Sequence, residues 1–134
     1  MKKRIVFSFL VIVLVLIFMI GNVKDTTVFS GVLVGIDNVE VDVKITRTNF
    51  DKIFNKMSED IIVEGKGVNY RYIFSGHIFE MEGYYATPIR RMSKTGLASQ
   101  GYLLFDDKMK NIIIETNQER IYSAEEDFVD MVVN

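Results

Sequence analysis

The segment VEVDVKIT, residues 39–46, decides the fold of most of this chain. Valine and isoleucine occupy its odd-numbered positions, and charged or hydroxyl side chains occupy its even-numbered positions. This two-residue period is typical of a β-strand with one face in a hydrophobic core and the other in water. The preceding residues 27–36 are rich in β-branched side chains, and Asp37-Asn38 favours a tight turn. The two runs together predict a β-hairpin.

A short helix is predicted directly after this hairpin. Phe50, Ile53, Phe54 and Met57 follow the spacing i, i+3, i+4, i+7 of an amphipathic helix, and Thr48 is a suitable N-cap. We expect the apolar face of this helix to dock on the sheet.

Further strands are expected after the helix, because apolar and aromatic runs alternate with segments of turn-forming residues. Gly65-Lys66-Gly67 and Ser93–Gly96 are two such turns. The predicted strands are residues 60–64, 69–74, 77–85, 89–92, 97–105 and 112–116. A capping box of Ser123 and Glu126, followed by Phe128, Met131 and Val132 on one face, predicts a C-terminal helix.

Short strands joined by short turns favour antiparallel pairing, since parallel neighbours need crossovers of a dozen residues or more. We therefore predict an α+β domain, mainly an antiparallel β meander with a helix after the first hairpin and a C-terminal helix. A small β-barrel is the alternative, because the number of predicted strands is enough to close one.

The N-terminal residues form a separate element. The run from Ile5 to Ile20 is apolar except for Ser8, and residues 2–4 before it are all basic. Such a run has no polar face with which to join a soluble core. We interpret residues 1–24 as a signal-anchor or transmembrane segment that contacts the membrane through residues 5–23. Residues 25–134 form one β-rich domain, because this length suits a single core.

Charge and cleavage signals define the expected location. Basic residues before the apolar run place the N-terminus inside and the C-terminal domain outside, as a single-pass protein of the cell membrane. The stretch after Ile20 matches the small-residue cleavage pattern poorly, which favours retention of the segment. Secretion after signal cleavage is the alternative.

Composition excludes several functions. The chain contains no cysteine, which removes thiol catalysis, cysteine metal sites and disulfides, and suits a bacterial cell envelope. Four of the sixteen basic residues precede residue 25, so twelve basic side chains face eighteen acidic ones in the outer domain. Such an acidic surface repels phosphate backbones, so we expect no nucleic-acid partner.

No catalytic or metal-binding pattern is complete. His77, the single histidine, would lie on the opposite strand face from Glu80 and Glu82. Lys94-Thr95-Gly96 lacks an accompanying Ser-x-x-Lys motif, and Asp106-Asp107 lacks the calcium-loop spacing. We interpret all of these as turn residues, and predict no enzyme activity, no cofactor and no metal.

One group of residues suggests a binding surface. Tyr70, Tyr72 and Phe74 share one strand face, and aromatic groups on neighbouring strands line cavities or form contact patches. Arg71 on the other face and Arg90-Arg91 form the basic concentration outside the anchor. These six residues are the candidate ligand or partner surface, although core packing would also explain the aromatic side chains.

Three functions follow from these patterns. The first is a membrane-anchored extracytoplasmic binding or accessory domain with an envelope protein as its partner. The second is a barrel-like carrier that holds a small ligand among the aromatic residues. The third, which the motifs support least, is a small hydrolase whose carboxylates converge from distant strands.

Overall fold

The computed structural model describes residues 2–35, 38–74, 76–92 and 99–133. Its helices are α1 (Lys2–Gly21), α2 (Asn49–Ile53) and α3 (Glu126–Val133). Its strands are β1 (Lys24–Val34), β2 (Val39–Thr48), β3 (Ile61–Gly65), β4 (Val68–Phe74), β5 (Phe79–Glu80), β6 (Tyr85–Arg91), β7 (Gln100–Phe105), β8 (Ile112–Thr116) and β9 (Arg120–Ser123).

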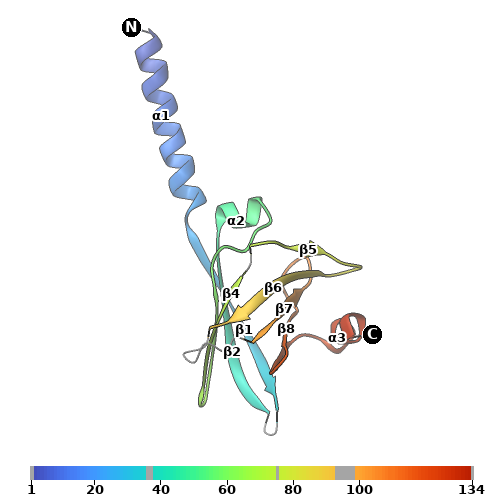
Figure 1. The fold of residues 1–134 in the computed structure, drawn as a ribbon. Helices are drawn as coiled ribbons and strands as arrows, with labels where there is room; N and C mark the ends of the chain where they lie inside the picture. Colours follow the sequence, from blue (N-terminus) through green and yellow to red (C-terminus); the bar gives the residue numbers. More distant parts are fainter. Residues whose placement is uncertain (1, 36–37, 75, 93–98, 134) are drawn as a thin grey trace.

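The strands form one antiparallel sheet that closes on itself. Its order is β4-β3-β2-β1-β9-β8-β7-β6-β5, and β4 also pairs with β6. Closure comes from two pairs of strands, with Leu33 opposite Ile121 between β1 and β9, and Tyr72 opposite Arg91 between β4 and β6. Within the described residues, eight strands therefore make a barrel and β5 adds to the edge of β6 (Figure 1). The α+β prediction is confirmed, in its barrel form.

The barrel follows the order of the chain. Each barrel strand pairs with the barrel strands that precede and follow it in sequence. Strand β5, between β4 and β6 in sequence, is not part of the ring. The β3–β4 turn at Lys66-Gly67 is tight, and Gly67 has the positive φ of 75° that glycine adopts without strain. The predicted turn at residues 65–67 is thus confirmed.

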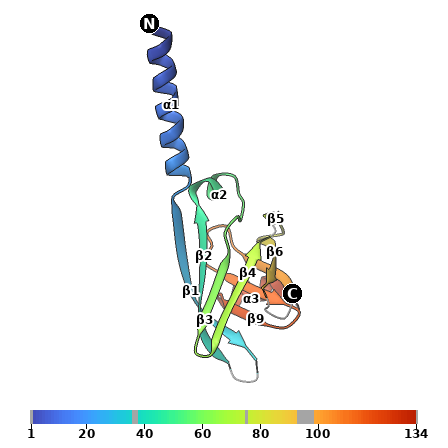
Figure 2. The same cartoon turned by 60° about the vertical axis from the view of Figure 1, so that its left-hand side comes forward.

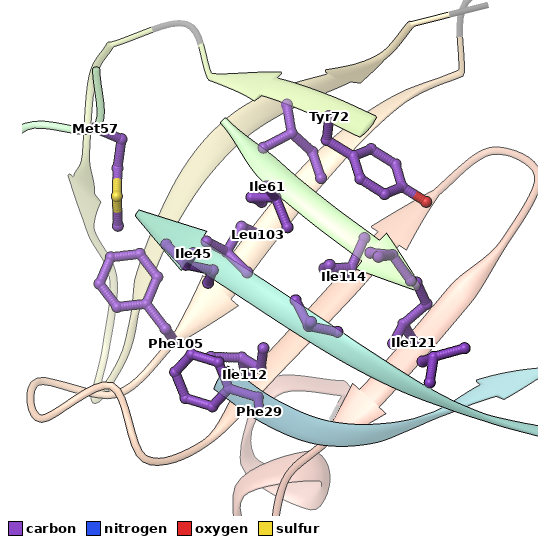
Figure 3. Close-up of a cluster of buried hydrophobic side chains, with 14 residues drawn as sticks. Phe29, Ile45, Met57, Ile61, Tyr72, Leu103, Phe105, Ile112, Ile114 and Ile121 are labelled. Atoms are coloured by element: carbon purple, nitrogen blue, oxygen red, sulfur yellow. The ribbon is translucent and has the colours of Figure 1, made fainter. Parts of the chain in front are cut away.

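The barrel interior is filled by apolar side chains (Figure 3). The predicted alternation of residues 39–46 is confirmed, because Val41, Val43 and Ile45 are buried whereas Asp42 is exposed. Side chains from opposite walls meet in the centre, where Ile114 and Val63 are both 0% exposed. The remaining buried members of this core are Phe29, Met57, Ile61, Tyr72, Ile89, Leu103, Phe105, Ile112 and Ile121.

A second, smaller core lies outside the barrel, under α3. Phe128 of this helix packs against the outward-facing Ala86, Leu104 and Ile113. The C-terminal helix is therefore confirmed, but its predicted start is wrong. Ser123 belongs to β9, where its hydroxyl donates to the carbonyl of Ser30 at 2.7 Å, because barrel closure recruits this residue before the helix begins.

The predicted strand over residues 77–85 is much shorter in the structure. Only β5 is extended, and the chain then turns, with Gly83 at a φ of 84° and the Met81 N–H bonded to the Tyr84 carbonyl at 2.8 Å. Strand β6 starts at Tyr85, earlier than predicted, and continues through Pro88. Pro88 lies where β6 changes its neighbour from β5 to β4. No backbone hydrogen bond to either strand is needed at this point, so the missing N–H of proline is tolerated.

Two predicted turns fall on positions that the structure does not describe. The centre of the β1–β2 connection, Ile36-Asp37, and the Ser93–Gly96 turn both lie outside the described residues. The hairpin itself is confirmed by the pairing of Leu33 with Val39.

The α1 helix leaves the barrel from one end, which we name the near end; the opposite end is the far end (Figure 1). Turning the view by 60° shows α1 continuing into β1, with α2 beside this junction (Figure 2). Helix α1 is long and apolar enough to cross a membrane.

The filled interior makes a test of the fold possible. We expect Val63→Ala to lower the free energy of unfolding by about 2 kcal/mol, because two buried methyl groups are lost and a cavity remains. Val28 on the outer wall is 56% exposed, so Val28→Ala should change stability by less than about 0.5 kcal/mol. Denaturant unfolding of the detergent-solubilised chain, followed by circular dichroism, measures both. Equal losses in the two variants would contradict this core.

Candidate functional site

The barrel wall separates the six residues of the candidate surface. Tyr72 is 0% exposed inside the barrel, and Tyr70 and Phe74 are half-buried against the same core. Arg71 and Arg90 are exposed on the outside, where Arg71 pairs with Asp60. Arg91 instead lies over the Tyr70 ring and shares the Glu119 carboxylate with Tyr72. The six residues therefore do not form one continuous surface.

A polar cluster lies toward the far end of the barrel. The Tyr72 hydroxyl donates to Glu119 Oε1 at 2.6 Å, and Arg91 Nη1 donates to Glu119 Oε2 at 2.9 Å. The Arg91 guanidinium also lies 4.0 Å from the centre of the Tyr70 ring, a cation–π distance. Both Glu119 oxygens thus have partners, which a carboxylate that is only 8% exposed requires.

Burial raises the pKa of the Tyr72 hydroxyl, and the hydrogen bond to Glu119 raises it further. The phenol therefore stays protonated and acts as a donor to the carboxylate, which is a positioning role rather than that of a base. Glu119 was missed by sequence reasoning. It follows Asn117-Gln118 in an ordinary polar turn between β8 and β9, so no local pattern marks it.

Arg47 occupies the near end. Its Nη2 donates to the carbonyls of Asp51 and Lys56 at 3.3 and 3.4 Å, and its Nη1 lies 3.5 Å from the sulfur of Met109. Burial lowers the pKa of Arg47, although the Asp51 carboxylate opposes this effect. Because both carbonyls belong to the segment that begins with α2, Arg47 holds this segment across the barrel mouth.

The outer wall carries a hollow of about 500 Å³ between β4, β6 and β7. Arg90 and Tyr102 are exposed at its rim, and Phe74 reaches it from the barrel side. The other lining residues are Ile73, Pro88, Ile89, Gln100 and Gly101. Aromatic and arginine side chains of this kind are enriched in protein–protein contacts. Two of the six candidate residues, Phe74 and Arg90, therefore meet at this hollow.

The remaining polar motifs have structural roles. His77 is exposed, and its carbonyl accepts a hydrogen bond from Thr87 Oγ1 at 2.5 Å. Asp106 accepts from the Lys110 and Asn111 backbone N–H groups and from the Asn111 side chain, and so closes its own loop. Within the part of the chain that the structure describes, no group of histidine and acidic residues is arranged to hold a metal.

Comparison with known proteins assigns no relative. No protein-family model matches the chain, and neither a curated protein nor a solved structure is similar to it.

The far-end cluster predicts a specific response to alkali. Unfolded tyrosine ionises near pH ~10. Since the pKa of Tyr72 is raised in the folded state, its protonation contributes stability that is present below pH ~10 and is lost as the pH rises above it. We expect the free energy of unfolding to fall more steeply above that pH in the native chain than in Tyr72→Phe.

Tyr102→Phe is the matched control, because Tyr102 is exposed on the outer wall. Its stability curve should run parallel to that of the native chain. At neutral pH, Tyr72→Phe should itself cost about 1–3 kcal/mol, because one Glu119 oxygen loses its buried donor. Denaturant titrations at several pH values provide the measurement, and identical alkaline slopes in the native chain and Tyr72→Phe would be the contrary result.

Proposed function

We propose that this chain is a membrane-anchored extracytoplasmic domain of a bacterial cell envelope, and that it binds another envelope protein without catalysing a reaction. Helix α1 is its anchor, and the barrel is its outer domain. The observation that carries the proposal is the direct junction between an apolar helix and a barrel whose interior is filled by apolar side chains.

The anchor is supported by composition and charge. Residues 5–20 offer a bilayer an apolar surface on every side, and residues 2–4 are basic. Positive charges of this kind remain on the cytoplasmic side of a membrane, so the barrel would face outward. Retention of α1 as a single-pass anchor is part of the proposal.

The junction between α1 and the barrel is held by several contacts. Asn49 Nδ2 donates to the Ile20 carbonyl at 2.8 Å, which satisfies one of the free carbonyls at the end of α1. The Asn49 N–H bonds to the Val23 carbonyl at 3.2 Å. Gly21 is buried under the Phe50 ring, and a side chain at this position would collide with that ring. These contacts would hold the barrel at a fixed height above the membrane.

The outer wall is the surface that remains for recognition. Apolar side chains fill the interior, and Glu119 and Arg47 lie at the two ends. This arrangement supports binding at the outside more than carriage of a small ligand within. The hollow with Arg90 and Tyr102 is the part of the outer wall that we assign to the protein partner.

Single cysteines test the orientation, because the chain has none of its own. We expect a membrane-impermeant maleimide to label Lys66→Cys at the β3–β4 turn in intact cells. The same reagent should label Lys3→Cys only after permeabilisation. Gel mobility of the labelled chains also reports whether α1 is retained. Labelling of Lys3→Cys alone in intact cells would reverse the proposed orientation.

Photo-cross-linking tests the partner surface. A photoreactive residue in place of Tyr102, at the hollow, is expected to capture one protein partner in living cells. The matched position is Asp42, which is exposed on β2 across the barrel. Capture from both positions equally, or from neither, would contradict the assignment of the hollow.

A further inference from the structure

The most exposed apolar side chains of the described barrel domain gather in one place. Ile53 is 72% exposed and Phe54 is 63% exposed, and both stand at the end of α2. The sequence predicted that they would dock on the sheet together with Phe50 and Met57. That prediction is wrong for Phe50, Ile53 and Phe54, since Phe50 packs on α1 and Met57 is the one of the four that reaches the barrel core.

Hydrogen bonds on the polar side of α2 determine which way Ile53 and Phe54 point; we call these two residues the apolar edge. Asp51 is buried and forms a capping box with Thr48, with its Oδ2 accepting from the Thr48 N–H at 2.9 Å. Its Oδ1 accepts from the Ser58 hydroxyl at 2.6 Å, and Arg47 bonds to its carbonyl. The polar side of α2 is therefore tied down over the barrel mouth. Ile53 and Phe54 have no such ties to the barrel and remain on the outer side.

The apolar edge is continuous with α1 through a series of rings. Phe18 of α1 lies 6.3 Å from Phe50, and Phe50 stacks on Phe54 at 6.1 Å between ring centres. Phe54 therefore adds to the apolar surface of the helix end rather than forming a separate patch. Lipid or solvent that contacts the last turn of α1 therefore contacts Phe54 as well.

Helix length sets the depth of this surface. The apolar run of sixteen residues, 5–20, rises roughly 24 Å, whereas the hydrocarbon core of a bilayer is about 30 Å thick. A span that is too short draws its flanking residues toward the lipid. Residues packed on Gly21 at the end of α1 would then lie in the interfacial layer, where amphipathic segments bury apolar side chains.

We propose that Ile53 and Phe54 insert into the outer interfacial layer of the lipid bilayer beside α1, and so seat the near end of the barrel on the membrane. This inference rests on the proposed anchoring by α1. The occupant is lipid because the patch is continuous with the anchor helix. Of the nearby lysines, Lys52 pairs with Asp25 at 2.7 Å and Lys56 is exposed, so we expect insertion to depend more on apolar contact than on anionic lipid.

Fluorescence quenching in vesicles tests this seating. The full chain is reconstituted with a polarity-sensitive fluorophore on a single cysteine at Phe54→Cys, Leu14→Cys or Lys66→Cys. The vesicles are phosphatidylcholine, with and without phosphatidylglycerol, and contain lipids with quenchers at a shallow depth or at the acyl-chain ends. We expect shallow quenchers to act several-fold more strongly on position 54 than on position 66, with little effect of phosphatidylglycerol.

Position 14, in the middle of α1, distinguishes the two proposals. Deep quenching at 14 with water-like emission at 54 would overturn the seating and leave the anchor intact. Water-like emission at 14 would overturn the anchor itself. Protection at 54 without lipid quenching, together with chain dimers detected by cross-linking, would assign the patch to a second copy and overturn the lipid assignment.

A pair of double variants separates lipid contact from a folding defect. The fluorophore is moved to Lys56→Cys, an exposed position just after the patch. Shallow quenching there should persist in Ile53→Leu/Phe54→Leu and fall several-fold in Ile53→Ser/Phe54→Ser. The near-end fold is monitored by proteolysis of the solubilised chains, which should be equal in both. Unchanged quenching in the serine variant would overturn the proposal.

Discussion

Closure of the sheet is the constraint on which the rest of the structure depends. A strand at the edge of an open sheet leaves a row of backbone N–H and C=O groups unpaired, whereas a closed ring pairs them. In this chain the ring is completed by β9 on β1 and by β4 on β6, through three residue pairs in each case within the described residues. These short contacts bring the inward faces of eight strands around one axis and create the shared core. Without disulfides, the barrel domain relies on this core for its stability.

Closure also determines what the barrel offers to other molecules. A ring of eight strands has an interior that side chains can fill, and here large apolar groups fill it. Two polar contacts lie toward the ends, Tyr72 with Glu119 and Arg47 with the α2 segment, and the buried Nε of Arg47 has no hydrogen-bond partner among the described residues. In the described residues, the exposed surface is therefore the outer wall rather than the interior. The α2 segment that covers the near end also contacts α1, so the closure of the barrel and its attachment to the helix share the same residues.

Local patterns predicted most of the strands, and the exceptions have physical causes. Strand β2 has ten residues with a regular period, whereas β9 has only four and was missed, because so short a run shows no alternation. The predicted strand around Phe79 fails because Gly83 turns the chain back before a long pairing can form. A helix at Phe50 was predicted correctly, but it ends at Ile53, before Met57, because the chain turns at Asn55 with a positive φ of 52°. Its periodicity could not show that Phe50 faces α1 and that Ile53 and Phe54 face the solvent rather than the sheet.

The candidate site was also only partly predictable from the sequence. Periodicity placed Tyr70 and Tyr72 on one strand face and Arg71 on the other, as the structure has them. It could not show that this shared face is the interior, or that Glu119, 47 residues further along the chain from Tyr72, would supply the acceptor.

The amino-acid sequence by itself determined the apolar helix, the turn at residues 65–67 and the alternation of side chains along β2, because each of these follows from neighbours within a few residues. Only the tertiary structure decided that the sheet closes, that Arg47 and Arg91 lie toward opposite ends of the barrel, and that Phe54 is exposed. Those features depend on pairing between distant segments such as β1 with β9 and α1 with α2, and the free energy of such pairing is not encoded in any local run.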